Sequence, residues 1–77
     1  MRKIEVLGMG CPKCESTVRN AKQAVKELDI QAEVLKVNDI DEITARGVML
    51  TPALLIDGEI RAVGKVPTVE EIKSWLG

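Results

Sequence analysis

The chain has 77 residues, 45% hydrophobic and 30% charged, which fits a single soluble domain over residues 1–77 and excludes a second one. Eleven Lys and Arg against twelve Asp and Glu give a formal net charge of −1, so the chain lacks the basic field of a nucleic-acid-binding protein. The longest apolar run, Ala53 to Ile56, is far shorter than the roughly 20 residues of a membrane span. We therefore expect neither nucleic acid nor a membrane as a partner.

Two cysteines, Cys11 and Cys14, are the only ones in the sequence, and there is no histidine. The segment from Met1 to Glu5 lacks the apolar stretch and cleavage site of a signal peptide, so we expect a cytoplasmic protein. In that reducing compartment a closely spaced cysteine pair is more often catalytic or metal-binding than structural.

The first expected strand covers residues 3–7 and is broken by Gly8-Met9-Gly10. A helix follows over residues 12–28. Pro12 suits its first position, which makes Cys11 the N-cap. One apolar stripe at helical spacing contains Cys14, Val18, Ala21, Val25 and Leu28.

A second strand is expected over residues 31–37, where apolar and polar side chains alternate imperfectly. A short second helix is expected from Asp39 to Arg46. Asp39 and Glu42 resemble a capping box, and Gly47 suits the left-handed residue that ends a helix.

The last part of the chain predicts a hairpin and a helix. Thr51-Pro52 opens a buried strand over residues 53–56, because a proline must lie at a strand's start or edge. Asp57-Gly58 is a strong hairpin signal, and residues 59–63 return as the partner strand. Thr68 and Glu71 then predict a capped helix from Thr68 to Trp75.

The predicted order is βαβαββα, an α/β fold in which a four-stranded mixed sheet is flanked by three helices. Because helices separate the first three strands, we expect those strands to be mostly parallel, with the hairpin adding an antiparallel edge.

A thiol at a helix start faces free backbone N–H groups and the positive end of the helix dipole, both of which favour thiolate. Cys11 occupies that place, and Lys13 adds a cation beside it. Cys14 begins the buried stripe and should be less acidic. Cys11 is thus the expected nucleophile and Cys14 the resolving thiol, while Pro12 and Lys13 between them tune the balance.

Glu5 lies six residues before Cys11 on a presumed central strand, where an unpaired carboxylate is costly. Two interpretations stay open. Either Glu5 exchanges a proton with Cys14, or it pairs with Lys3 or Lys36 at the sheet surface.

Two metal hypotheses compete with the redox one. Half of a four-thiolate zinc site has the same Cys-x-x-Cys spacing, but the sequence holds no second pair and no histidine. The string Gly8-Met9-Gly10-Cys11-Pro12-Lys13-Cys14 resembles the GMxCxxC loop of heavy-metal-associated domains, which carry soft ions such as Cu(I) on two thiolates. Those domains have the order βαββαβ and end on a strand, whereas this chain is predicted to end on a helix.

With Cys-Pro-Lys-Cys at a helix start and Thr51-Pro52 opening a strand that ends in an Asp-Gly hairpin, the chain resembles small, glutaredoxin-sized members of the thioredoxin superfamily over nearly all its length. The resemblance implies that Pro52 is cis and faces the cysteines, and that the Thr51 backbone pairs with substrate. It also implies that Gly64 lets a partner approach the site.

The chain departs from the pattern at three places. Gly10 stands where thioredoxins carry a tryptophan, so the docking surface is built differently. Pro12-Lys13 is neither the Gly-Pro of thioredoxins nor the Pro-Tyr of glutaredoxins. The residues after Gly64 lack the paired glycines that glutaredoxins use near glutathione, which favours protein disulfides as substrates.

The leading hypothesis from sequence is a monomeric cytoplasmic thiol-disulfide oxidoreductase acting on protein disulfides and supplied with electrons by an upstream disulfide reductase. It needs no bound cofactor and no metal, because the Cys11-Cys14 dithiol is itself the redox group. The alternative hypothesis is a soft-metal carrier that uses the same two cysteines.

Overall fold

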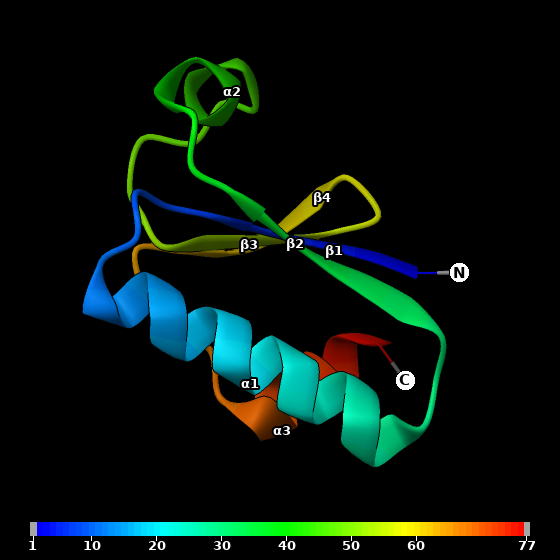
Figure 1. The fold of residues 1–77 in the computed structure, drawn as a ribbon. Helices are drawn as coiled ribbons and strands as arrows, with labels where there is room; N and C mark the ends of the chain where they lie inside the picture. The colour runs from blue at the N-terminus through cyan, green and yellow to red at the C-terminus, as the bar shows by residue number, and fades with distance from the viewer. Residues whose placement is uncertain (1, 77) are drawn as a thin grey trace.

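The computed structural model describes residues 2–76, so Met1 and Gly77, the two ends of the predicted domain, lie outside the described residues. Its elements follow the predicted order βαβαββα (Figure 1). The strands are β1 (Arg2–Leu7), β2 (Ala32–Val37), β3 (Ala53–Ile56) and β4 (Glu59–Val63), and the helices are α1 (Pro12–Leu28), α2 (Ile40–Ala45) and α3 (Val69–Leu76).

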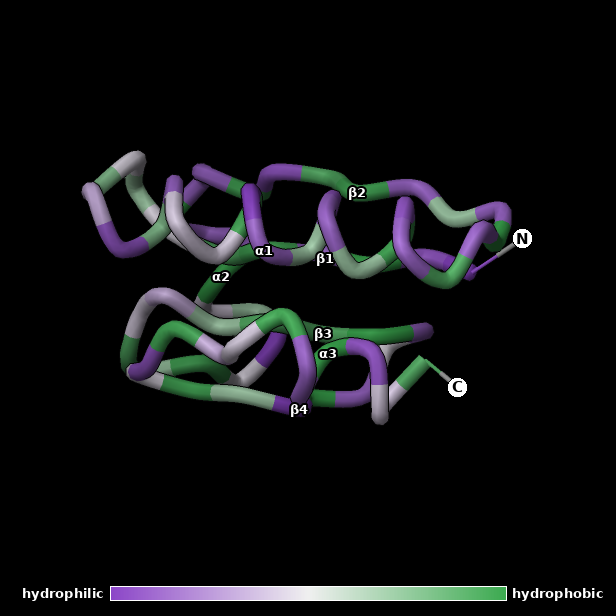
Figure 2. Tube along the Cα trace, turned by 90° about the horizontal axis from the view of Figure 1, so that it is seen from below, coloured by the Kyte–Doolittle hydropathy of each residue, from purple (hydrophilic) through white to green (hydrophobic). Residues whose placement is uncertain are grey.

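The four strands form one mixed sheet in the order β2-β1-β3-β4, so the predicted fold class is confirmed. Helices α1 and α3 lie against one face of the sheet, and α2 lies on the other side near the end where β1 leads into α1 (Figure 1). Seen from below, α1 runs along the β1 and β2 half and α3 along the β3 and β4 half (Figure 2).

One part of the predicted topology is wrong. Strand β1 is parallel to β2, as expected, but it is antiparallel to β3, with Ile4 opposite Ile56 and Leu7 opposite Ala53. The reason is the position of α2: this six-residue helix stays at the end of the sheet where β2 finishes, so the chain enters β3 from that same end. Only a crossover that returns the chain to the opposite end gives a parallel strand.

Two apolar clusters cover the two faces of the sheet. Alternation along β1 places Ile4 and Val6 in the larger cluster with α1 and α3, and Leu7 in the smaller cluster with Ile43 of α2. Strand β3 is buried along its whole length because it contributes to both clusters. Its uniformly hydrophobic sequence, green in Figure 2, is what a strand covered on both faces requires.

The α2 face holds one buried charge. Glu5 is 4% exposed, and its carboxylate forms an ion pair with Arg46, the residue that ends α2. Both sequence interpretations of Glu5 therefore missed its partner, and Lys36 pairs with Glu15 at 3.3 Å instead. The ion pair fastens the C-terminal end of α2 to the central strand.

Arg46→Ala is expected to lower the free energy of unfolding by about 2 kcal/mol, because the buried Glu5 carboxylate loses its partner. The loss should stay below the roughly 3–5 kcal/mol of a fully buried pair, since the Arg46 side chain is 30% exposed. Urea unfolding measures it. Glu42→Gln, which removes only the exposed partner of Arg46, is the control and should change stability by less than about 0.5 kcal/mol. Equal losses in the two variants would contradict an anchoring role for Glu5.

Candidate active site

The two cysteines lie where β1 passes into α1. Cys11 is the N-cap of α1, with the extended backbone expected there, and Pro12 occupies the first helical turn. The Cys11 Sγ accepts a hydrogen bond from the backbone N–H of Cys14 at 3.2 Å. Cys11 is partly exposed, whereas Cys14, one turn into the helix, is only 4% exposed. One thiol therefore faces outward and the other inward.

This placement makes the two thiols chemically unequal. A hydrogen bond with the Cys14 side chain, and next the bond from the Cys14 backbone N–H, hold the pKa of Cys11 below its ordinary value. Burial, and next the hydrogen bond with Cys11, raises the pKa of Cys14. Because the thiolate is the nucleophile in exchange, Cys11 is the better attacking group at neutral pH.

Lys13 acts on Cys11 through its backbone. The Lys13 N–H is among the groups that lower the pKa of Cys11, in line with the free backbone N–H groups that the sequence predicts around an N-cap thiol. The Lys13 carbonyl accepts a hydrogen bond from the buried Thr17 hydroxyl at 2.9 Å, which ties the first turn of α1 to its second.

The loop before β3 reaches the cysteines. A Cβ atom built on Gly8, beside Cys14, would lie 3.9 Å from the Thr51 Cβ. The Thr51-Pro52 peptide bond is cis and Pro52 is buried. The Pro52 carbonyl accepts a hydrogen bond from the Gly64 N–H at 2.9 Å, so Gly64 is held against the same loop.

The two predicted glycines have different surroundings. Gly10 has φ +84° and open space where a side chain would stand, so the turn itself requires glycine. Gly64 has φ +72°, and a Cβ there would meet the Leu50 side chain at 3.3–3.4 Å. The Leu50 side chain therefore packs against Gly64, the glycine at which the resemblance implies that a partner approaches.

A groove beside this loop was missed from the sequence. It has a volume of about 370 Å³ and lies between α2 and the two loops that carry Met9 and Thr51; its lining is Met9, Ile40, Ile43, Thr44, Val48, Met49 and Thr51. Large apolar side chains at its edge stay exposed: Met9 is 62% exposed, Ile40 64% and Met49 89%. The apolar run Val48-Met49-Leu50 before Thr51-Pro52 was the available signal, because such side chains are normally buried.

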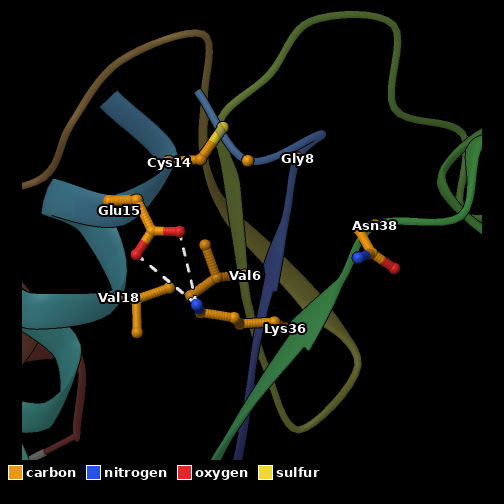
Figure 3. A pocket seen from close by; sticks show the side chains of 8 residues that line it. Val6, Gly8, Cys14, Glu15, Val18, Lys36 and Asn38 are labelled. Atoms are coloured by element: carbon orange, nitrogen blue, oxygen red, sulfur yellow. Dashed lines mark hydrogen bonds and ion pairs between the residues drawn. The ribbon is translucent and has the colours of Figure 1, made fainter. Parts of the chain in front are cut away.

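A smaller hollow of about 80 Å³ borders Cys14 between the ends of β1 and β2 and the start of α1 (Figure 3). Its lining includes the Glu15 and Lys36 ion pair, whose carboxylate is turned toward Lys36. The Cys14 Sγ points away from that pair, toward Gly8 (Figure 3). The Cys14 thiol is therefore turned toward the end of β1 and not toward the neighbouring charges.

Comparison with known proteins agrees with this geometry. The family model of the thioredoxin domain matches residues 2–77. A thioredoxin of Methanocaldococcus jannaschii is 51% identical over 73 residues, which cover 95% of this chain and 84% of the relative. A thioredoxin of Methanothermobacter thermautotrophicus is 43% identical over 76 residues, 99% of each chain.

This chain belongs to the thioredoxin family. It is a thiol-disulfide oxidoreductase, as the leading hypothesis from sequence held. The soft-metal carrier has no support, because the chain matches the thioredoxin family and its elements follow the order βαβαββα, not the βαββαβ of heavy-metal-associated domains. In residues 2–76 no three or more His, Cys, Asp or Glu side chains lie together as a candidate metal site. No helix in those residues has the length and apolar character to cross a membrane.

Cys14→Ala is expected to raise the pKa of Cys11 toward its ordinary value, because the side-chain hydrogen bond that lowers it most is removed. At pH 7 the thiolate fraction of Cys11 then falls, and alkylation by iodoacetamide slows. The pH dependence of the alkylation rate, followed by intact mass, measures the change. Cys14→Ser, which keeps a hydroxyl donor, is the matched control and should give a smaller rise. An unchanged midpoint in Cys14→Ala would show that the backbone alone sets the acidity of Cys11.

Proposed function

We propose that this thioredoxin-family protein reduces disulfides of other proteins through its Cys-Pro-Lys-Cys dithiol. The observation that carries the proposal is the unequal pair of thiols at the start of α1: Cys11 is exposed enough to attack and has a lowered pKa, while Cys14 is buried and has a raised pKa. An attacking group and a held-back resolving group are what two-step exchange needs.

The reaction proceeds in two displacements. The Cys11 thiolate attacks one sulfur of the substrate disulfide, forms a mixed disulfide and expels the other substrate sulfur as thiolate, which takes up a proton. Cys14 then loses its proton and attacks the Cys11 sulfur, which releases the second substrate thiolate and leaves the Cys11-Cys14 disulfide. Two electrons pass from the dithiol to the substrate.

The dithiol is the whole redox group, so the protein requires no bound cofactor and no metal. An upstream disulfide reductase restores the Cys11 and Cys14 thiols by reversing the same two steps. We place the protein in the cytoplasm, since two thiols without any further cysteine suit a reducing compartment. We expect it to act as a monomer.

Substrate binding uses the loops around Cys11. Thr51 and Pro52 supply backbone next to the cysteines; Gly64 is hydrogen-bonded to Pro52, and Gly10 directly precedes Cys11. Met9, Met49 and the other apolar groove residues give an apolar contact surface in place of a tryptophan. A protein segment around a disulfide offers apolar side chains to cover that surface, whereas charged glutathione does not.

We expect Cys11 and Cys14 to be oxidised together in a single reversible transition when the metal-free protein is equilibrated with graded dithiol and disulfide buffers. Counting free thiols by alkylation and intact mass gives the potential. A value near about −270 mV marks a reductant and a value near about −120 mV an oxidant. Failure of the Cys11-Cys14 disulfide to form at any buffer ratio would contradict the proposed function.

Met49→Asp is expected to slow reduction of a protein disulfide such as insulin by about tenfold, because a charge at the groove replaces an apolar contact with the substrate, worth about 1.4 kcal/mol. Reduction of a small aromatic disulfide, which does not reach the groove, should keep its rate. Ile60→Asp is the matched control, because Ile60 is 46% exposed but lies near the Asp57-Gly58 turn, at the other end of β3 from Thr51-Pro52. If both variants slow insulin reduction equally, the groove is not the docking surface.

A further inference from the structure

Gly8, the residue that ends the first strand, has no space for a side chain. A Cβ atom built on it would overlap the Cys14 Sγ and would lie 3.0 Å from the Cys14 Cβ. An overlap with Sγ of this kind cannot be relieved without moving Cys14, because real Cβ atoms do not approach other heavy atoms so closely. The Cys14 sulfur therefore occupies the space that a side chain at position 8 would fill.

The need for glycine here is one of space and not of backbone conformation. Gly8 is not among the glycines with positive φ, whereas Gly10 is. The Gly8 N–H donates to the Val37 carbonyl at 2.9 Å, which continues the pairing of β1 with β2. Any residue could take this backbone position if the sulfur were absent.

The contact lies at the start of α1, beside the end of β1. Cys14 lies in the first turn of α1, and its N–H donates to the Cys11 Sγ at 3.2 Å. If a methyl group occupied the place beside Gly8, either the Cys14 side chain would rotate away or the start of α1 would shift outward. Each movement changes the distance and angle between the two sulfurs.

We propose that Gly8 is a positioning residue for the resolving thiol: its missing side chain lets the Cys14 sulfur lie buried against the end of β1 and within reach of Cys11. The proposal rests on the proposed function and concerns its second displacement, in which the Cys14 thiolate attacks the Cys11 sulfur and expels the remaining substrate thiolate. The first displacement is made by the Cys11 sulfur and depends on Gly8 only through the Cys14 side-chain hydrogen bond that lowers the pKa of Cys11.

Gly8→Ala separates the two displacements. The reduced protein is mixed with 5,5′-dithiobis(2-nitrobenzoate), and the released thionitrobenzoate is followed by stopped flow. The first equivalent reports attack by Cys11 and the second reports resolution by Cys14. In Gly8→Ala the first rate should fall no further than it does in Cys14→Ala, which lacks the same side-chain hydrogen bond. The second rate should fall by about 100-fold, the effect of displacing a reacting atom by roughly 1 Å.

Gly58→Ala is the matched control. It also adds a methyl group to a glycine, with φ +86° and open space, in the hairpin turn at the far end of β3. It should destabilise the protein and leave both release rates unchanged. Equal second-phase rates in wild type and Gly8→Ala would overturn the positioning role alone. A wild-type protein that releases only one equivalent would overturn the proposed function itself.

A second measurement covers the case in which Gly8→Ala does not fold. Thermal unfolding is compared for Gly8→Ala, Cys14→Ala and the double variant. Because Cys14→Ala removes the overlapping sulfur, Gly8→Ala should lower the melting temperature much less in that background than in wild type. The same loss in both backgrounds would show that Gly8 is required for a reason other than the sulfur, and would overturn the proposal.

Discussion

The hydrogen bond from the Cys14 N–H to the Cys11 sulfur is the interaction on which the rest of the site depends. It exists because Cys11 is the N-cap of α1, where backbone N–H groups have no helical partner. Together with the hydrogen bond to the Cys14 side chain, which lowers the pKa of Cys11 most, it makes the outer sulfur the more acidic one, while burial raises the pKa of Cys14. The fold supplies the geometry around it: β1 ends just before the helix start, and the Thr51 loop reaches the same edge.

The two faces of the sheet divide the work. The face under α1 and α3 carries the larger apolar cluster. Through this cluster α1 packs on the sheet and on α3. The α2 face is smaller and keeps one charge, Glu5, which is committed to Arg46. Since α2 is short and fastened at one end, it covers little of the sheet and leaves the apolar groove beside Met49 open. The docking surface proposed for substrate thus lies on the less completely covered face.

Local signals were enough to predict the helices and strands and the position of both cysteines at the start of α1, because an N-cap, a proline or a hairpin turn acts within a few residues. Strand direction was predicted wrongly for β3, since it depends on where α2 packs and not on the residues of β3. The partner of Glu5 was missed for the same reason: Arg46 is 41 positions away (46 − 5), and only the packing of α2 brings it near. The groove required α2 and two loops to be placed together.

The Gly8-Met9-Gly10 string shows why a loop motif alone misleads. It resembles the loop of heavy-metal-associated domains, yet in this structure its two glycines answer separate constraints. Gly10 provides a positive φ that turns the chain into the helix, and Gly8 provides space for the Cys14 sulfur. Only Gly8 belongs to the GMxCxxC pattern, since Gly10 stands at its variable position. Because the path of this chain explains each glycine, the string alone does not indicate a metal site, and the order of helices and strands over the whole domain is what separates the two hypotheses.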